Sequence, residues 1–200
     1  MQLTAREIGS ERGGRPIFDG ISFKVGDGDL FIVTGPNGAG KSTLLRIVAG
    51  LLPATEGTIS LDPARDGSRG VWMHYLGHRD GLKSALSVRE NLNFWRRTAG
   101  PTGLEPLEAL DRVRLGHLID MPAGYLSAGQ KRRVAIARLL AVSRPIWLLD
   151  EPTAALDAQS EADLGEIIAE HVAANGMVLA ATHLKLPVEA TQRLEMGMSP

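Results

Sequence analysis

The sequence predicts an α/β fold in which a parallel sheet carries helices on both faces. The first observation is an apolar run at residues 30–33 that enters a glycine-rich loop and then a helical pattern at residues 42–50. The second is the alternation of helices and buried strands in the later half of the chain, at residues 129–142 (helix), 146–149 (strand), 158–175 (helix) and 178–181 (strand). Strands that alternate with helices in this way build a parallel sheet.

The remaining elements follow from local signals. Strands are expected at residues 2–8, 21–25, 29–34, 58–61 and 71–76. Gly50 and Gly176 are suitable residues to end the helices that precede them.

The middle of the chain shows helical patterns without intervening strands. Helical patterns at residues 88–97 and 105–115 flank a breaker run at residues 99–103. We therefore expect one domain over residues 1–200, with a core of residues 1–78 and 129–200 and a small helical subdomain at about residues 79–128.

Composition limits the classes of function. A hydrophobic content of 44% over 200 residues suits a globular domain, and a net charge of −1 gives no electrostatic argument for nucleic acid. The absence of cysteine excludes disulfides, thiolate zinc sites and iron–sulfur ligation within the chain. No signal peptide and no membrane-spanning stretch is predicted, so work at a membrane requires docking on another chain.

Residues 35–42 fit the pattern G-x-x-x-x-G-K-[ST] of a phosphate-binding loop. Glycines let backbone N–H groups converge on phosphate, Lys41 reaches the β- and γ-phosphates, and the Ser42 hydroxyl ligates Mg²⁺. The pattern predicts binding of a nucleoside triphosphate. The expected binding residues are Gly35, Pro36, Asn37, Gly38, Ala39, Gly40, Lys41, Ser42 and Thr43.

Asp150 and Glu151 directly follow the buried strand at residues 146–149. A carboxylate at the end of a strand beside the loop strand is placed to hold Mg²⁺ through water, which is the role expected of Asp150. Glu151 then faces the γ-phosphate and orients or activates the attacking water. The alternative is a surface Asp-Glu pair that merely ends a strand, and the loop upstream argues against it.

A second motif precedes the helix at residues 129–142 and consists of Leu126, Ser127, Ala128, Gly129 and Gln130. Ser127 is a good N-cap, and the free N–H groups of a helix start attract anions. Taken alone, the motif describes only a capped helix. After the glycine loop and just before Asp150 and Glu151, it resembles the signature of the ABC ATPases. That resemblance implies a P-loop NTPase (RecA-like) core with an N-terminal antiparallel β subdomain and a small ABC-type helical subdomain.

The resemblance also implies roles for single residues. The signature motif contacts the γ-phosphate of ATP held by a second ATPase subunit, so an ATP-sandwich dimer is expected, with a homodimer as its simplest form. Asp157 matches the loop that communicates between the two sites, and His183 matches the switch histidine. Lys41, Glu151 and His183 are then the catalytic residues of a Mg²⁺-dependent ATPase.

Two positions depart from the usual ABC pattern. Where an aromatic residue normally stacks on adenine, this chain offers Arg12, whose guanidinium can also stack on a base. An exposed loop arginine is the alternative. Where a glutamine normally joins core and helical subdomain, this chain has His78, whose neutral ring offers one acceptor to Mg²⁺ or water. A spacer in the hinge is the alternative there.

His78 and the stretches at residues 77–83 and 126–133 resemble one subfamily, the CcmA-type ATPases of cytochrome c maturation. This resemblance implies CcmB-type and CcmC-type membrane subunits and a peripheral location at the cytoplasmic face of the inner membrane. ATP turnover would drive haem delivery or release of a haem-loaded chaperone. Alternatives are a compact soluble ABC ATPase, such as an iron–sulfur assembly ATPase, or the ATPase of an ABC transporter for another substrate.

The segment of residues 77–95 is rich in large apolar side chains, which predicts an apolar groove for docking on a membrane subunit. The residues concerned are Leu82, Leu86, Leu92, Phe94 and Trp95. The alternative is that they pack the subdomain itself.

Overall fold

The computed structural model describes residues 1–64 and 69–197 and contains two sheets. The antiparallel sheet has the order β2-β1-β4, with β1 at Gln2–Arg12, β2 at Arg15–Gly26 and β4 at Glu56–Asp62. The parallel sheet has the order β5-β6-β7-β3-β8. Its strands are β3 Leu30–Thr34, β5 Met73–Leu76, β6 Ile146–Asp150, β7 Met177–Ala181 and β8 Gln192–Glu195.

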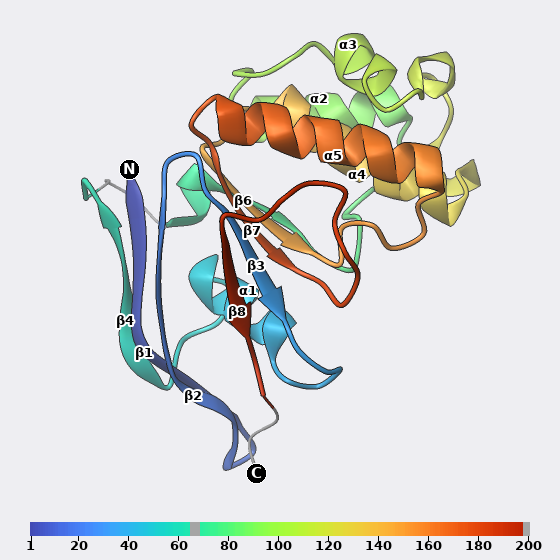
Figure 1. Ribbon diagram of the computed structural model, residues 1–200. Helices are drawn as coiled ribbons and strands as arrows, with labels where there is room; N and C mark the ends of the chain where they lie inside the picture. The colour runs from blue at the N-terminus through green and yellow to red at the C-terminus, as the bar shows by residue number, and fades with distance from the viewer. Residues whose placement is uncertain (65–68, 198–200) are drawn as a thin grey trace.

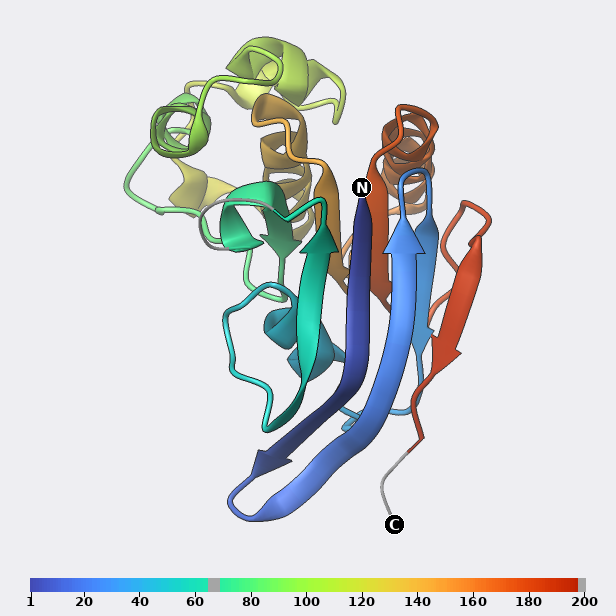
Figure 2. The same cartoon turned by 90° about the vertical axis from the view of Figure 1, so that its left-hand side faces the viewer.

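Helices cover both faces of the parallel sheet, as predicted. Figures 1 and 2 show α4 and α5 on one face, with α2 and α3 beyond them, and α1 on the other face. The α-helices are α1 Lys41–Val48, α2 Val88–Ala99, α3 Pro106–Asp111, α4 Ala128–Ala141 and α5 Ala158–Ala173. Short 3₁₀ helices are η1 Arg69–Trp72, η2 Gly116–Leu118 and η3 Ala123–Tyr125.

The core is divided by the parallel sheet, because side chains alternate between its two faces. On β6, Trp147 and Leu149 enter the cluster that includes α2, α3, α4 and α5. Ile146 and Leu148 of the same strand enter the cluster with α1 and the antiparallel sheet. Both faces of β6 are therefore apolar, and its polar side chain, Asp150, stands at the end of the strand.

The helical segment packs directly on this core. Leu92 of α2 and Leu110 of α3 are fully buried in the same cluster as Leu149. The division into a core and a subdomain at about residues 79–128 remains a prediction.

Strand order corrects one expectation. The strand that ends at Asp150 was expected beside the loop strand β3, but β7 lies between β6 and β3. β6 and β7 are both fully buried apolar strands. The apolar pattern therefore does not indicate which of the two lies next to β3.

Three further differences from the sequence pattern appear. The helix expected at residues 105–115 ends at Asp111, because Arg114 takes a φ of 58° and the Leu115 N–H turns back to donate to the Leu110 carbonyl at 2.8 Å. β8 is absent from the predicted elements. It is a largely exposed edge strand that pairs with β3 through its backbone, so it carries no apolar signal. Residues 71 and 72, expected in a strand, belong to η1.

Two histidines, one buried and one half-buried, pack between the sheet and its helices. His74 of β5 donates from Nε2 to the Val142 carbonyl at 2.6 Å, and burial lowers its pKa to about 4. His171 of α5 stacks on Trp147 with ring centroids 3.8 Å apart, and burial likewise lowers its pKa to about 4.

We expect the protein to lose stability as the pH falls from about 6.5 towards 4. In that range the unfolded chain protonates these histidines while the folded chain keeps them neutral, so the unfolded state binds more protons. Each histidine contributes up to about 1.4 kcal/mol per pH unit. Denaturant unfolding of His74→Gln should show a shallower dependence on pH than wild type, because glutamine still donates to Val142 but does not titrate. The exposed His117→Gln is the matched control, and equal slopes for wild type and His74→Gln would contradict this account.

Candidate nucleotide-binding and catalytic site

The glycine loop joins β3 to α1 at the carboxyl end of the parallel sheet. Gly35 has a φ of 142°, and a Cβ there would lie 2.3 Å from the Met196 carbonyl oxygen. Gly40 has a φ of 91°, and a Cβ there would lie 2.7 Å from side-chain atoms of Ile17 and Phe18. At both positions a side chain would clash and the backbone conformation favours glycine, so the loop requires glycine there.

Lys41 and Ser42 begin α1 at the end of this loop. The Lys41 side chain is buried, and its Nζ donates to the carbonyls of Gly35 at 2.7 Å and Pro36 at 3.0 Å. The Ser42 hydroxyl donates to Asp150 Oδ1 at 2.8 Å. The ammonium thus lies within the loop, and a hydroxyl and a carboxylate meet beside it at the start of a helix.

Asp150 is held by a second hydroxyl that the sequence pattern does not reveal. Tyr75, on β5, donates to Asp150 Oδ2 at 3.2 Å, and Arg46 Nε donates to the Tyr75 hydroxyl at 3.2 Å. Burial raises the pKa of Tyr75.

Glu151 and His183 follow the adjacent strands β6 and β7. Glu151 has a φ of 45°, and its N–H donates to the Ala181 carbonyl at 2.8 Å. Its Oε1 lies 2.9 Å from His183 Nδ1. The two side chains are 25% and 56% exposed, so both remain accessible from solvent.

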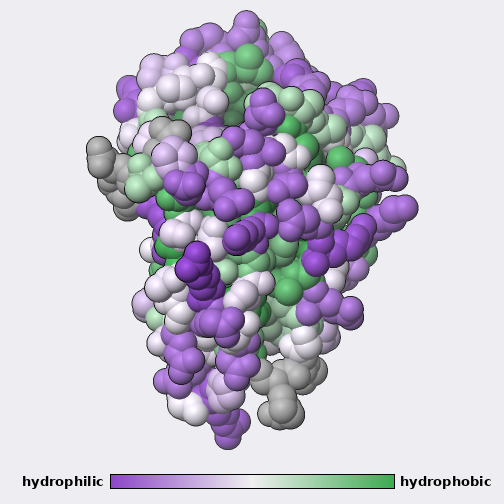
Figure 3. Space-filling view, turned by 60° about the vertical axis from the view of Figure 1, so that its left-hand side comes forward, coloured by the Kyte–Doolittle hydropathy of each residue, from purple (hydrophilic) through white to green (hydrophobic). Residues whose placement is uncertain are grey.

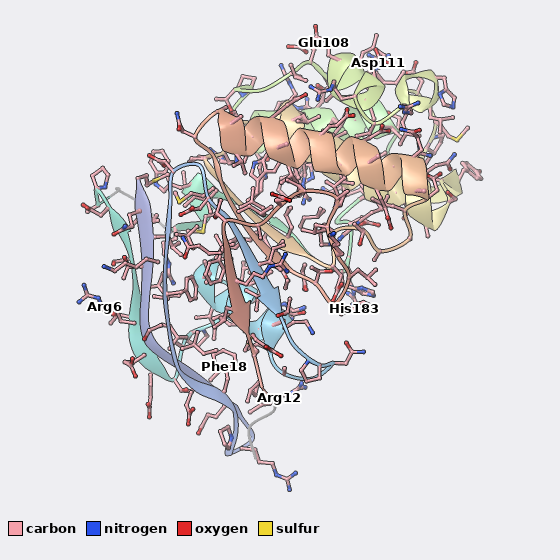
Figure 4. All side chains as sticks on the ribbon, viewed as in Figure 1. Arg6, Arg12, Phe18, Glu108, Asp111 and His183 are labelled. Carbon is pink, nitrogen blue, oxygen red and sulfur yellow. The ribbon has the colours of Figure 1, made fainter. Side chains whose placement is uncertain are left out.

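Lys41, Ser42 and Glu151 border one cavity of about 460 Å³ at the end of the sheet. It is lined by Arg12, Ile17, Asn37, Gly38, Gly40, Lys41, Ser42, Thr43 and Glu151. Figure 4 shows that Arg12, on the β1–β2 hairpin, and His183 both lie in the lower part of the molecule, away from the helical end. The structure therefore brings Arg12 to the glycine loop although they belong to different sheets.

The second motif lies away from that cavity, at the start of α4. Ser127 caps the helix: its Oγ accepts the Gln130 N–H at 3.2 Å, and its own N–H donates to Gln130 Oε1 at 2.8 Å. Leu126 is buried, whereas Ser127 and Ala128 are exposed. None of these residues lines the cavity of this chain's own glycine loop.

Asp157 lies close to this motif. It caps α5 by accepting the Ser160 N–H at 2.8 Å, a bond that lowers the pKa of Asp157. A Cβ at Gly129 would lie 2.7 Å from the Ala155 carbonyl, so the motif packs against the loop that leads to Asp157.

The comparisons with known proteins agree with this geometry. Residues 18–154 match the sequence model for the family described as ABC transporter. The chain belongs to the ABC transporter family. This confirms the resemblance to ABC ATPases that the motifs predicted, and with it the ability to bind and hydrolyse ATP.

Curated relatives of this ABC ATPase cover almost its whole length. One, from Chelativorans sp. (strain BNC1), is 53% identical over 98% of both chains. Another, from Mesorhizobium japonicum, is 52% identical over 100% of both. Both are named cytochrome c biogenesis ATP-binding export protein CcmA, the subfamily that the sequence resembles.

Solved structures support the fold. A putative ABC transporter ATP-binding protein from Pyrococcus furiosus has a TM-score of 0.85 at 24% identity, over 98% of both chains. A structure described as the ATP-binding subunit of an ABC transporter has a TM-score of 0.83 at 26% identity, over 92% of this chain and 80% of that one. The predicted α/β fold of the P-loop NTPase type is confirmed.

His78 lies exposed beyond β5 in this ABC ATPase. Among the hydrogen bonds of residues 1–64 and 69–197, none joins His78 to Ser42, Asp150 or Glu151. Its suggested place at the metal stays a prediction.

The prediction of an apolar docking groove is wrong for Leu92, because this residue is fully buried in the core. Leu82 is partly buried and packs against the same core cluster. Phe94 and Trp95 are half-buried beneath Lys83 and Arg138, whose cations lie 4.0 and 4.7 Å from the ring centroids. The face of the molecule seen in Figure 3 is mainly polar, with hydrophobic residues dispersed over it. The described helices include none long and apolar enough to cross a membrane.

We expect Arg12 to contribute to ATP affinity, because it lines the cavity and its guanidinium can stack on a base. Arg12→Ala should weaken ATP binding by roughly 0.5–2 kcal/mol, and Arg12→Tyr should retain much of the affinity. Titration with a fluorescent ATP analogue measures both. Arg15→Ala, on the same hairpin but outside the cavity, is the control. Equal affinities for wild type and Arg12→Ala would leave Arg12 as an exposed loop residue.

Proposed function

We propose that this chain is the ATP-hydrolysing subunit of a membrane ABC complex in cytochrome c maturation. Its ATP turnover would drive haem delivery or release of a haem-loaded chaperone. The observation that carries the ATPase assignment is the convergence of Lys41, Ser42, Asp150 and Glu151 at one end of the sheet. The names of the relatives support the biological setting.

The residues present suit ATP with Mg²⁺. Backbone N–H groups of the glycine loop and the start of α1 would hold the phosphates, with the Lys41 ammonium among them. The Ser42 hydroxyl and the Asp150 carboxylate are the hard oxygen donors that Mg²⁺ prefers, Asp150 acting through water. Bound Mg²⁺ would neutralise charge on the transferred phosphate.

The protein's own part in hydrolysis would be positioning and proton handling. Glu151 Oε1 would accept a proton from, or orient, the attacking water, and His183 Nδ1 would hold that carboxylate in place. Lys41 would stabilise negative charge on the γ-phosphate.

The exposed start of α4 supports a dimer. Ser127 and Ala128 lie outside their own chain's nucleotide cavity, at an exposed helix start of the kind that attracts anions. We propose that they contact ATP held by a second copy, with Asp157 linking the two sites. The complex would include CcmB-type and CcmC-type membrane subunits, with this chain peripheral at the cytoplasmic face of the inner membrane.

Lys41→Ala and Glu151→Gln should fail in different ways. Lys41→Ala should lose ATP binding, because the cation inside the phosphate loop is removed. Glu151→Gln should keep ATP bound while its turnover falls roughly 10²–10⁴-fold, since only the water-activating carboxylate is lost. Size exclusion with ATP should then show a Glu151→Gln dimer that is absent without nucleotide.

Glu166→Gln, an exposed position on α5 outside the cavity, is the control and should behave as wild type. A Glu151→Gln monomer at saturating ATP would refute the sandwich dimer. Membrane proteins that co-purify after gentle detergent extraction would identify the complex. Recovery of subunits unrelated to cytochrome c maturation would favour an ABC transporter for another substrate.

A further inference from the structure

The guanidinium of Arg132, on α4, connects two segments that border the proposed ATPase site. Nη2 donates to the carbonyls of Asp150 at 2.9 Å and Glu151 at 2.7 Å, and Nε donates to the Pro152 carbonyl at 3.1 Å. Nη1 donates to the Gly77 carbonyl at 2.7 Å and to Asp80 Oδ1 at 3.3 Å.

The Arg132 side chain is 4% exposed, so these bonds form away from water. A buried cation is tolerated only when its donors are satisfied and a counter-charge is near. Here every guanidinium nitrogen has an acceptor and Asp80 supplies the negative charge. A lysine has no such planar fork and could not reach all these acceptors at once.

The bonds from Arg132 to the end of β6 and to the turn that follows it stabilise an unusual backbone conformation, because Glu151 in this turn has a φ of 45°. Left-handed backbone is unfavourable for a residue with a long side chain and persists only when its surroundings impose it. At this turn the carbonyls of Asp150, Glu151 and Pro152 converge on one cation. The convergence fixes the turn that directs the Glu151 side chain towards His183.

We propose that Arg132 is a positioning residue for the Glu151 carboxylate, and that it ties this carboxylate to the segment of residues 77–80 and to α4, the helix that Ser127 caps. The proposal rests on the ATPase function proposed above. Arg132 touches neither the glycine loop nor the cavity, so it governs where Glu151 lies and leaves ATP binding to the loop.

The test compares steady-state ATP hydrolysis with ATP affinity in the full chain. Arg132→Gln should lower kcat roughly 10- to 100-fold, as expected when a catalytic group is displaced by about 1 Å. The dissociation constant of a fluorescent ATP analogue should stay within about threefold of wild type. Arg132→Lys should recover part of the lost kcat, because a cation near the carbonyls is restored.

Arg96→Gln is the matched control, since Arg96 of α2 is also buried but donates to the Gly103 and Leu104 carbonyls, which lie outside the cavity. It should keep kcat within about threefold of wild type, whatever its effect on the melting temperature. A similar kcat loss in Arg96→Gln would mark a general effect of losing a buried arginine and would overturn the proposal.

An unchanged kcat in folded Arg132→Gln, or kcat and ATP affinity lost together, would also overturn it. If Arg132→Gln does not fold, Arg132→Lys decides by the same split between kcat and affinity. Failure of the proposed function is distinguishable, because wild type itself would then not hydrolyse ATP.

Discussion

The hydrogen bond from the Ser42 hydroxyl to the Asp150 carboxylate is the contact on which the site depends. It joins the glycine loop to the end of β6, two parts of the chain 108 positions apart. Because β7 separates β6 from β3 in the sheet, the strands alone do not bring these groups together. α1 spans that distance, and it can do so because its apolar face packs between the two sheets.

The division of the core explains why the chemistry gathers at strand ends. The strands β3, β6 and β7 are buried on both faces, so a charged side chain within them would be costly. Asp150, Glu151 and His183 stand at or just beyond the carboxyl ends, where backbone and side chains reach water again. Glu151 is turned out of the sheet in a left-handed conformation, so that its carboxylate reaches His183.

Much of this arrangement was predictable from local sequence, and the rest was not for physical reasons. The glycine loop, the buried strands and the Ser127 cap each depend on residues close together in the chain. The order of β6 and β7 and the existence of β8 depend on long-range pairing, which leaves little trace in short apolar runs. Tyr75 and Arg132 act through partners far away in sequence, so no motif discloses them. The prediction for Leu92 was wrong for a different reason: it was assigned to an exposed docking groove, but it is fully buried in the core.

The back of the glycine loop is formed by the segment that follows β8. The Met196 carbonyl lies where a Gly35 side chain would be, and the Met196 N–H donates to the Thr34 carbonyl at 2.8 Å. The loop is therefore completed by a segment that is synthesised much later than the loop itself. A nascent chain or a proteolytic fragment that ends before β8 carries every motif residue and still lacks the wall behind its phosphate loop. The phosphate loop thus depends for its backing on the segment after an edge strand that contributes no residue to the candidate site.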